Sequence, residues 1–384
     1  MKSFNKQRLL DLPFNRPYMS GRELFYIRRA HAGSHLSGDG PFTKKCEKWL
    51  RKKTHCQKAL ITHSCTGALE MAGILAGIRP GDEIIMPSFA FVSTANAFVL
   101  RGGVPVFVDI RPDTLNIDEK KIENAITRKT RAIVALHYGG ISCEMDAILR
   151  LAKKYGLWLI EDAAQGILCS YKGKPLGSMG DFGVFSFHET KSIISGEGGA
   201  LLVHDRRFVT RAEIIREKGT NRSQFLRGQT DKYTWRDIGS SYLPSDIIAA
   251  FLYAQLEKAS WIIQKRLRLW SWYHDAFENL EKKGKLRRPT VPSHCRHNAH
   301  LYYLLLPDTK KRDKFMRQIN QRGIHTVFHY VPLHSSPAGR RFGRAATSMK
   351  VTNRLSGCLV RLPLWIGMEK QMSRVIHETF RLLS

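Results

Sequence analysis

Short runs of apolar and β-branched residues recur through the first half of the chain, separated by stretches with helical spacing. Runs of this length, bounded by turn residues, are typical of strands buried on both faces. One intervening stretch, Thr66 to Leu75, repeats apolar residues at the spacing of a helix face. Strands that alternate with helices in this way predict an α/β domain with a mainly parallel, seven-stranded sheet. The predicted strands are Ala59–Thr62, Glu83–Met86, Pro105–Val108, Arg131–Leu136, Leu157–Ile160, Phe182–Phe187 and Ala200–Val203.

The pattern changes after Ser245, where a long helical stretch begins and continues through Trp270. Gly284 and two prolines end it, and two further strand candidates follow, His300–Leu306 and His325–Tyr330, with a basic helix at 312–321 between them. We therefore predict a large domain over residues 14–250 and a smaller α+β C-terminal domain over residues 251–384. The long helix is expected to join the two.

Composition places the chain among ordinary folded proteins, with 384 residues, 43% hydrophobic and 25% charged. The 7 cysteines are scattered without a Cys-x-x-Cys pair, which indicates reduced thiols in a cytoplasmic protein. His294, Cys295, His297 and His300 fit no common metal-ligand spacing, so no metal is expected. No apolar run has the length of a membrane span, and Asp11 interrupts any signal-peptide core near the basic N-terminus.

The formal net charge of +29 is unusual for a chain of this size. A basic surface can attract nucleic acid, an anionic membrane or a phosphorylated substrate. The basic residues are spread along the chain and lie in no nucleic-acid-binding module, so we expect no specific nucleic-acid partner. Attraction of a nucleotide-linked substrate remains one interpretation, and a general basic bias of the protein remains the other.

Two residues suggest pyridoxal 5'-phosphate (PLP) chemistry. Lys191 stands in Ser-Phe-His-Glu-Thr-Lys before the glycine-rich Gly-Glu-Gly-Gly at 196–199, and Asp162 ends the apolar run at 157–160. PLP enzymes need a lysine that forms a Schiff base and an acid that pairs with the pyridine nitrogen. Either residue alone would be an ordinary surface lysine or a helix cap. Their combination predicts an enzyme with Lys191 and Asp162 as the catalytic residues.

Further residues could hold the cofactor. The segment Ser64-Cys65-Thr66-Gly67 follows a strand and opens a helix, a position that suits a phosphate, although a helix N-cap by Thr66 would look the same. Phe91 could stack on the cofactor ring or belong to the core. Gln165 is placed to reach the ring hydroxyl and Ser186 to reach the phosphate.

These motifs, together with Glu161-Asp162-Ala163-Ala164-Gln165, resemble the nucleotide-sugar aminotransferases of the DegT/StrS type. The resemblance extends from Pro13 over nearly the whole chain. It implies a fold-type I PLP-dependent aminotransferase that works as a homodimer, with each active site completed by the partner chain. Many members carry an asparagine in a Gly-Tyr-Asn-Tyr segment that reaches the phosphate across the dimer, and here this segment reads Gly239-Ser240-Ser241-Tyr242. The cofactor residues that it implies are Thr66, Gly67, Phe91, Asp162, Gln165, Ser186, Lys191 and Ser241.

Within the family, long segments are similar to members that form dTDP-4-amino-4,6-dideoxy-D-galactose for enterobacterial common antigen, a cell-surface polysaccharide. They include Pro13 to Pro17, Gly38 to Gly40, Arg216 to Arg222, Trp235 to Tyr242 and His329 to His334. This likeness implies transfer of an amino group from L-glutamate to the 4-keto carbon of dTDP-4-keto-6-deoxy-D-glucose. The substrate-binding residues that it implies are Asn15, Arg16, Asp39, His188, Arg222, Arg236, His329, Tyr330 and His334.

Other functions fit less well. Sugar dehydratases of the same fold carry histidine in place of the Schiff-base lysine, which Lys191 argues against. A non-catalytic basic binding protein would not need lysine, aspartate and glutamine together. Amination of another nucleotide-linked keto sugar stays open, and the residues before Phe14 have no assigned role.

Overall fold

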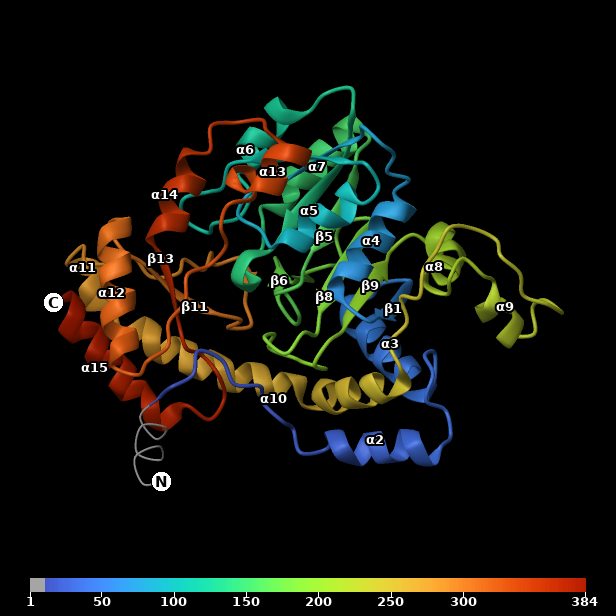
Figure 1. Ribbon diagram of the computed structural model, residues 1–384, viewed down its shortest axis with the longest axis horizontal. Helices are drawn as coiled ribbons and strands as arrows, with labels where there is room; N and C mark the ends of the chain where they lie inside the picture. Colours follow the sequence, from blue (N-terminus) through green and yellow to red (C-terminus); the bar gives the residue numbers. More distant parts are fainter. Residues whose placement is uncertain (1–10) are drawn as a thin grey trace.

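The computed structural model describes residues 11–384, and its centre is a large sheet with helices on both faces (Figure 1). The sheet has eight strands in the order β1-β9-β8-β5-β4-β2-β3-β12. Their bounds are Lys58–Thr62 (β1), Glu83–Pro87 (β2), Val104–Val108 (β3), Thr130–Leu136 (β4), Trp158–Asp162 (β5), Phe182–Ser186 (β8), Gly199–Val203 (β9) and Arg344–Ala345 (β12). All seven predicted strands are present. The eighth, β12, was not predicted, so the expectation of seven strands is corrected to eight.

Most neighbours in this sheet are parallel, as the alternation of strands and helices predicted. The pairs β12–β3, β3–β2, β2–β4, β4–β5 and β5–β8 are parallel, whereas β9 runs antiparallel to both β8 and β1. The carboxyl ends of β4, β5 and β8 therefore meet at one edge of the sheet, where ligands bind in folds of this kind.

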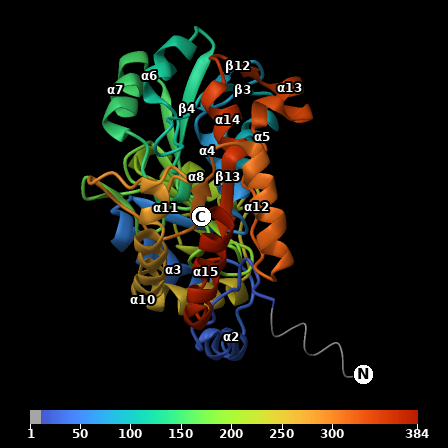
Figure 2. The same ribbon diagram turned by 90° about the vertical axis from the view of Figure 1, so that its left-hand side faces the viewer.

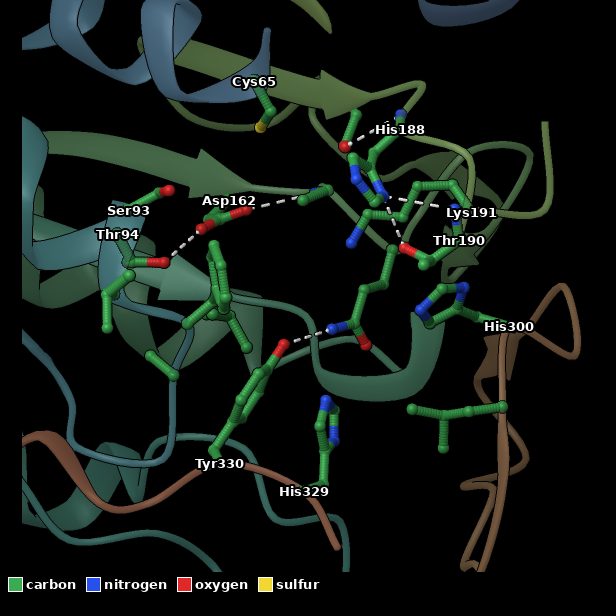
Figure 3. A pocket seen from close by; sticks show the side chains of 18 of the residues that line it. Cys65, Ser93, Thr94, Asp162, His188, Thr190, Lys191, His300, His329 and Tyr330 are labelled. Carbon is green, nitrogen blue, oxygen red and sulfur yellow. Dashed lines mark hydrogen bonds between the residues drawn. The ribbon is translucent and has the colours of Figure 1, made fainter. Parts of the chain in front are cut away.

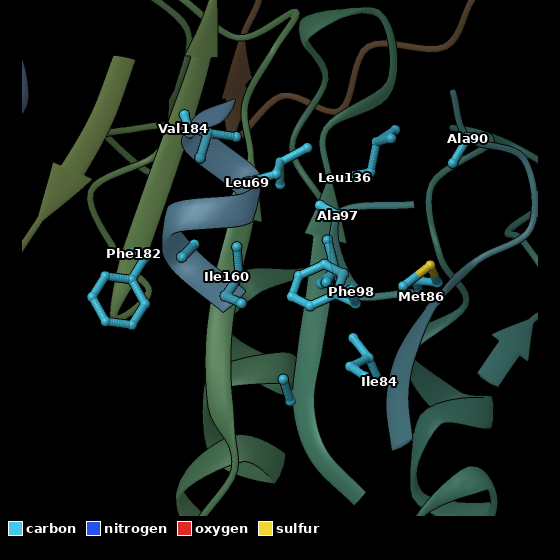
Figure 4. Packing of buried hydrophobic residues seen from close by; sticks show 14 of the residues in the cluster. Leu69, Ile84, Met86, Ala90, Ala97, Phe98, Leu136, Ile160, Phe182 and Val184 are labelled. Atoms are coloured by element: carbon cyan, nitrogen blue, oxygen red, sulfur yellow. The ribbon is translucent and has the colours of Figure 1, made fainter. Parts of the chain in front are cut away.

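Successive residues of a strand face opposite sides of the sheet, and each side has its own core. In β2, Ile84 and Met86 pack with Leu69 and Phe98 on one face (Figure 4), while Ile85 belongs to the cluster on the other. Burial of both faces explains why the strands read as continuous apolar runs. The helices that supply the two faces are α3 (Pro41–Thr54), α4 (Cys65–Leu75), α5 (Val92–Val99), α6 (Glu119–Ile122), α7 (Met145–Tyr155) and α8 (Val209–Arg216).

The long predicted helix is α10, Asp246–Ala276, and the Ser245 hydroxyl caps it by accepting from the Ile248 N–H at 3.4 Å. Its first half packs under the large sheet and against α2 (Glu23–Ala32), and its last turns join a separate apolar cluster in the C-terminal part (Figures 1 and 2). That cluster also contains residues of α11 (Glu278–Lys282), β11 (Tyr302–Leu305), α12 (Thr309–Gln321), β13 (Leu359–Leu362) and α15 (Met372–Leu383). The remaining elements are α9 (Arg222–Leu226), α13 (Pro337–Phe342), α14 (Lys350–Cys358), β6 (Ser170–Tyr171), β7 (Lys174–Pro175) and β10 (Cys295–Arg296).

One predicted strand is wrong. Residues 325–330 form no regular strand, and this stretch makes only the isolated bridge between Val327 and Arg361. Tyr330 has φ of +39°, a left-handed conformation that a continuous strand does not allow. Thr326 and His329 of this segment are buried, whereas His325 and Phe328 are exposed, and the segment does not pair along its length.

The division at residue 250 stays a prediction. Helix α10 begins at Asp246, close to the proposed boundary, and β12 returns from the C-terminal part to pair with β3. Among the helices within residues 11–384, none has the length and apolar composition to cross a membrane. The N-terminal segment considered as a signal peptide lies, for residues 1–10, outside the described part of the chain.

Candidate active site

A cavity of about 760 Å³ opens at the carboxyl ends of the central strands. This volume is in the range of pockets that take a drug-sized ligand. Its walls come from the loops after β1, β2, β4, β5 and β8 and from residues 300–301, 328–333 and 361–364 of the C-terminal part. Ten of the predicted site residues line it, namely Asn15, Thr66, Phe91, Asp162, Gln165, Ser186, His188, Lys191, His329 and Tyr330.

Lys191 lies in the loop after β8, and its backbone N–H donates to the carbonyl of His188 at 2.9 Å. Burial lowers the pKa of its amine below the ordinary lysine value, and the positive charge of Arg361 acts in the same direction. Cys65 and Asp162 act in the opposite direction. A lowered pKa increases the fraction of neutral amine, which is the form that attacks a carbonyl or accepts a proton.

Asp162 is the last residue of β5 and is 3% exposed. Its carboxylate accepts a hydrogen bond from the Thr94 hydroxyl at 2.7 Å and one from the Ala164 N–H at 3.1 Å (Figure 3). Thr94, which belongs to α5, was not among the predicted site residues. The two bonds hold a buried carboxylate in one orientation at the cavity wall.

Gln165 is held at both ends of its amide. Its Oε1 accepts from the Gly139 N–H at 2.7 Å. Its Nε2 donates to the Tyr330 hydroxyl at 2.8 Å, which is the dashed line that ends on Tyr330 in Figure 3. Burial raises the pKa of Tyr330 and lowers that of His329, so both side chains stay neutral near pH 7. The amide of Gln165 can therefore present a fixed polar group to the cavity.

The start of α4 forms another part of the wall. Ser64 is the N-cap residue, and its Oγ accepts from the Gly67 N–H at 3.0 Å, so the interpretation of Thr66 as the cap is wrong. The Thr66 hydroxyl instead lies 2.8 Å from that of Ser93, and both residues line the cavity. Two hydroxyls beside a helix N-terminus suit a phosphate group.

Gly67 itself does not line the cavity. A Cβ at this position would lie 3.0 Å from ring atoms of His63 and Tyr242, so packing against these rings accounts for the glycine. Its role at the phosphate stays a prediction.

The remaining lining residues lie nearer the mouth. Phe91 is 56% exposed, which leaves its ring available to a ligand, and its centroid lies 6.3 Å from that of Tyr330. Asn15 donates to the carbonyl of Glu189 at 3.5 Å. The Nδ1 of His188 lies 2.9 Å from the Thr190 hydroxyl.

Other predicted residues do not line this cavity in the single chain. Arg16 lines a small adjoining cavity, and Asp39 forms an ion pair with Arg216 at 3.1 Å. His334 lies 2.6 Å from the Ser88 hydroxyl, and Arg222 pairs with Glu217 at 3.2 Å. The remaining two, Arg236 and Ser241, are exposed in the segment between α9 and α10.

Sequence reasoning also missed three basic residues of the wall, Arg266, His300 and Arg361. The first two are buried, and Arg361 is partly exposed. Arg361 was visible as a charge inside the apolar run Leu359-Val360-Arg361-Leu362. His300 was considered only as a metal ligand, and nothing in the local sequence marks Arg266.

The histidine and cysteine residues considered as metal ligands do not lie together in the structure. His300 lines the cavity, Cys295 pairs with Tyr171 in β10, and His297 packs on Trp270 at 4.5 Å. Within residues 11–384 no three His, Cys, Asp or Glu side chains form a group that could hold a metal ion.

Comparison with known proteins identifies the family. The chain matches the DegT/DnrJ/EryC1/StrS aminotransferase family over residues 17–381, and it belongs to this family. It is 33% identical over 333 residues to the spore coat polysaccharide biosynthesis protein SpsC of Bacillus subtilis, and this match covers 85% of each chain. It is 31% identical over 365 residues to the GDP-perosamine synthase of Caulobacter vibrioides, covering 94% of this chain and 95% of the relative.

A solved structure of DesI in the presence of its TDP-sugar product has a TM-score of 0.86 with this chain. The sequences are 27% identical, and the match covers 96% of this chain and 92% of DesI.

The protein is thus an aminotransferase, and its cofactor is PLP. The residues present fit this group, because a lysine with a lowered pKa and a buried, oriented carboxylate share one cavity with two hydroxyls at a helix N-terminus. The fold-type I architecture expected from the sequence is confirmed.

Proposed function

We propose that the enzyme transfers the amino group of L-glutamate to the 4-keto carbon of dTDP-4-keto-6-deoxy-D-glucose. The product would be dTDP-4-amino-4,6-dideoxy-D-galactose, an amino sugar for a cell-surface polysaccharide such as enterobacterial common antigen. The observation that carries the aminotransferase part is the pairing of Lys191 and Asp162 in one cavity at the strand ends.

PLP, when bound, draws electrons from the carbon atom that exchanges a proton during transamination. Lys191 would hold the cofactor covalently and, once released, carry that proton, which its lowered pKa favours. Asp162, fixed by Thr94 and the Ala164 N–H, would lie against the pyridine nitrogen and keep it protonated.

The other cofactor contacts follow the same proposal. Gln165 would donate to the ring hydroxyl, and Phe91 would stack on the ring. Thr66, Ser186 and the start of α4 would bind the phosphate, with Gly67 and Ser241 as further candidates.

The choice of sugar rests on two kinds of support. Asn15, His329 and Tyr330 belong to the segments that resemble dTDP-sugar aminotransferases, and all three line the cavity. His188, also implied to bind the substrate, lines it as well. The structure of DesI was solved in the presence of its TDP-sugar product, whereas the Caulobacter relative is a GDP-perosamine synthase. The nucleotide is therefore the part of the proposal that needs a direct test.

The test is to incubate the holoenzyme and L-glutamate with dTDP-4-keto-6-deoxy-D-glucose or with the corresponding GDP-linked keto sugar. Products would be identified by mass spectrometry and NMR. We expect an amino group at C4 with the galacto configuration in the dTDP reaction. Preference for the GDP sugar would contradict the nucleotide assignment, and absence of amination with any keto sugar would contradict the function.

We also propose a cytoplasmic homodimer. All seven cysteines are free thiols, as in a reducing compartment. Phe91 and Val92 of the cavity wall are 56% and 57% exposed. Trp235, in the segment between α9 and α10, is 82% exposed, and a partner chain would cover apolar surfaces of this kind. Light scattering should give the mass of a dimer, and a fully active monomer would refute this part.

A further inference from the structure

Helix α3 presents a dense set of positive charges to solvent. Six of its 14 residues are lysine or arginine, and all six are exposed, namely Lys44, Lys45, Lys48, Arg51, Lys52 and Lys53. Three of them, Lys44, Lys48 and Lys52, recur every four residues and therefore lie along one side of the helix. The only acid of the helix, Glu47, is buried and pairs with Arg216. Within residues 11–384 none of the six cations forms an ion pair, so their charge is open to an external partner.

The neighbouring helix α2 exposes apolar and basic side chains together. Leu24 is 72% and Phe25 is 42% exposed, and Arg28 and Arg29 follow one turn later on the same side of the helix. The opposite side of α2 is buried, where Tyr26 belongs to an apolar cluster that α2 shares with α3 and α10. Large apolar side chains beside arginines are typical of helices that lie in the interfacial layer of a bilayer.

The two helices form one continuous surface. The rings of Tyr26 in α2 and Phe42 in α3 lie 5.4 Å apart, and both contact the ring of Tyr253 in α10. The ammonium group of Lys45 covers this junction, at 4.8 Å from the Phe42 ring centroid and 5.3 Å from that of Tyr253. Both helices lie in the lower part of Figures 1 and 2, beside the first half of α10. We call their exposed residues the α2–α3 face.

We propose that the α2–α3 face binds the anionic headgroups of a membrane surface, as a peripheral contact of the enzyme. The lysines of α3 would be attracted by the negative surface potential of the membrane, while Leu24 and Phe25 would enter the interfacial layer. None of the residues of this face lines the active-site cavity. The inference therefore goes beyond the proposed function and does not depend on which sugar the enzyme aminates.

Other partners match this face less well. A two-fold contact between two copies brings the same surface of each copy together, which would place the unpaired lysines of α3 opposite one another. Nucleic acid supplies negative charge but no apolar layer for Leu24 and Phe25. An anionic bilayer supplies both, and it extends over a plane wide enough to meet two helices at once.

The test measures co-sedimentation of the full-length holoenzyme with vesicles of phosphatidylcholine, either alone or mixed with phosphatidylglycerol. A first variant, Lys44→Glu with Lys48→Glu and Lys52→Glu, reverses the charge along α3. A second, Leu24→Gln with Phe25→Gln, removes the apolar side chains and keeps the charge.

Helix α12 supplies the matched control. Lys310→Glu with Lys314→Glu and Arg317→Glu changes the net charge of the protein as much as the α3 variant does, at three exposed positions of another basic helix. Light scattering and the transamination rate with soluble substrates would show that each variant keeps its fold and its assembly.

We expect the wild type to bind the mixed vesicles, to bind them more weakly as salt is added, and to leave phosphatidylcholine vesicles unbound. A cation at an anionic membrane surface strengthens binding about fivefold, so the α3 variant should bind the mixed vesicles roughly a hundredfold more weakly. The variant of Leu24 and Phe25 should bind roughly tenfold more weakly at unchanged charge. The α12 variant should keep most of the binding, and the particle mass and transamination rate should stay the same in all variants.

A wild type that does not bind the mixed vesicles would overturn the inference. An equal loss in the α12 variant would overturn it as well, because the net charge alone would then account for binding. Unchanged binding after replacement of Leu24 and Phe25 would indicate attraction to any polyanion, and a lower particle mass of the α3 variant would assign the face to contacts between copies; either result contradicts a membrane site. Because the vesicle assay contains no substrate, its outcome is independent of the proposed function.

Discussion

The hydrogen bond from Thr94 to Asp162 offers a sharp test of how the site works. The Thr94 side chain is 1% exposed, and its hydroxyl lies 2.7 Å from a carboxylate that is itself buried. Thr94→Val keeps the shape of the side chain and removes the donor. A hydrogen bond to a charged group contributes about 1.5–3 kcal/mol, so the substitution removes roughly that much stabilisation of the oriented carboxylate. Only the hydrogen bond from the Ala164 N–H would then hold it.

If Asp162 must lie against the pyridine nitrogen, the loss should appear in the chemical step. We expect the half-reaction with glutamate to slow by roughly tenfold to a hundredfold, measured by stopped-flow absorbance under single-turnover conditions. Thr94→Ser keeps the hydroxyl and should stay near the wild-type rate. A wild-type rate in Thr94→Val, with cofactor bound, would refute the role of Thr94 in positioning Asp162.

Two further predictions concern Lys191. Lys191→Ala should keep the fold, shown by an unchanged thermal transition, but lose the visible absorbance of the holoenzyme and nearly all transamination; substantial turnover would contradict its catalytic role. In the apoenzyme, the amine of Lys191 should react with an acylating reagent at a lower pH than exposed lysines do, because burial lowers its pKa. Arg361→Gln should move this reaction to higher pH, since loss of a neighbouring positive charge favours the protonated amine, and a shift to lower pH would contradict this electrostatic argument.

The sheet was predictable because its strands are buried on both faces and therefore leave continuous apolar runs. The long helix was predictable because Ser245 caps it and its apolar spacing is regular. Strand β12 was not predictable, since two residues carry no periodicity and β12 exists only through its pairing with β3. The segment 325–330 has the composition of a strand, but the tertiary structure turns it into the cavity.

The active site was predictable where residues follow strands. Asp162 ends β5 and Lys191 follows β8, and the carboxyl ends of these strands meet at one edge because the strands are parallel neighbours. The role of Thr94 was not predicted because it lies 68 residues from Asp162 in the sequence, and no local pattern links the two residues. Arg361 carried a signal, a charge inside an apolar strand, that gains its meaning only when the surrounding space is known.

The sequence also suggests that the basic residues Arg222, Arg227 and Arg236, which lie between Arg216 and Tyr242, hold the acceptor diphosphate. In the single chain Arg222 pairs with Glu217 at 3.2 Å and Arg227 with Glu213 at 2.8 Å, so a diphosphate would have to replace these ion pairs. Arg236 is exposed. A diphosphate that must replace an existing ion pair gains less binding free energy than one that pairs with an exposed cation. We therefore expect Arg236→Ala to raise the acceptor KM most among the three alanine variants.

If the arginine contacts the diphosphate directly, its replacement by alanine should raise the acceptor KM by roughly tenfold to a hundredfold. The half-reaction with glutamate should stay nearly intact. Steady-state kinetics with each substrate varied in turn would measure both effects. If all three variants kept the wild-type acceptor KM, the +29 charge would have no part in substrate capture at this segment. The general basic bias of the protein would then be the better interpretation of that charge.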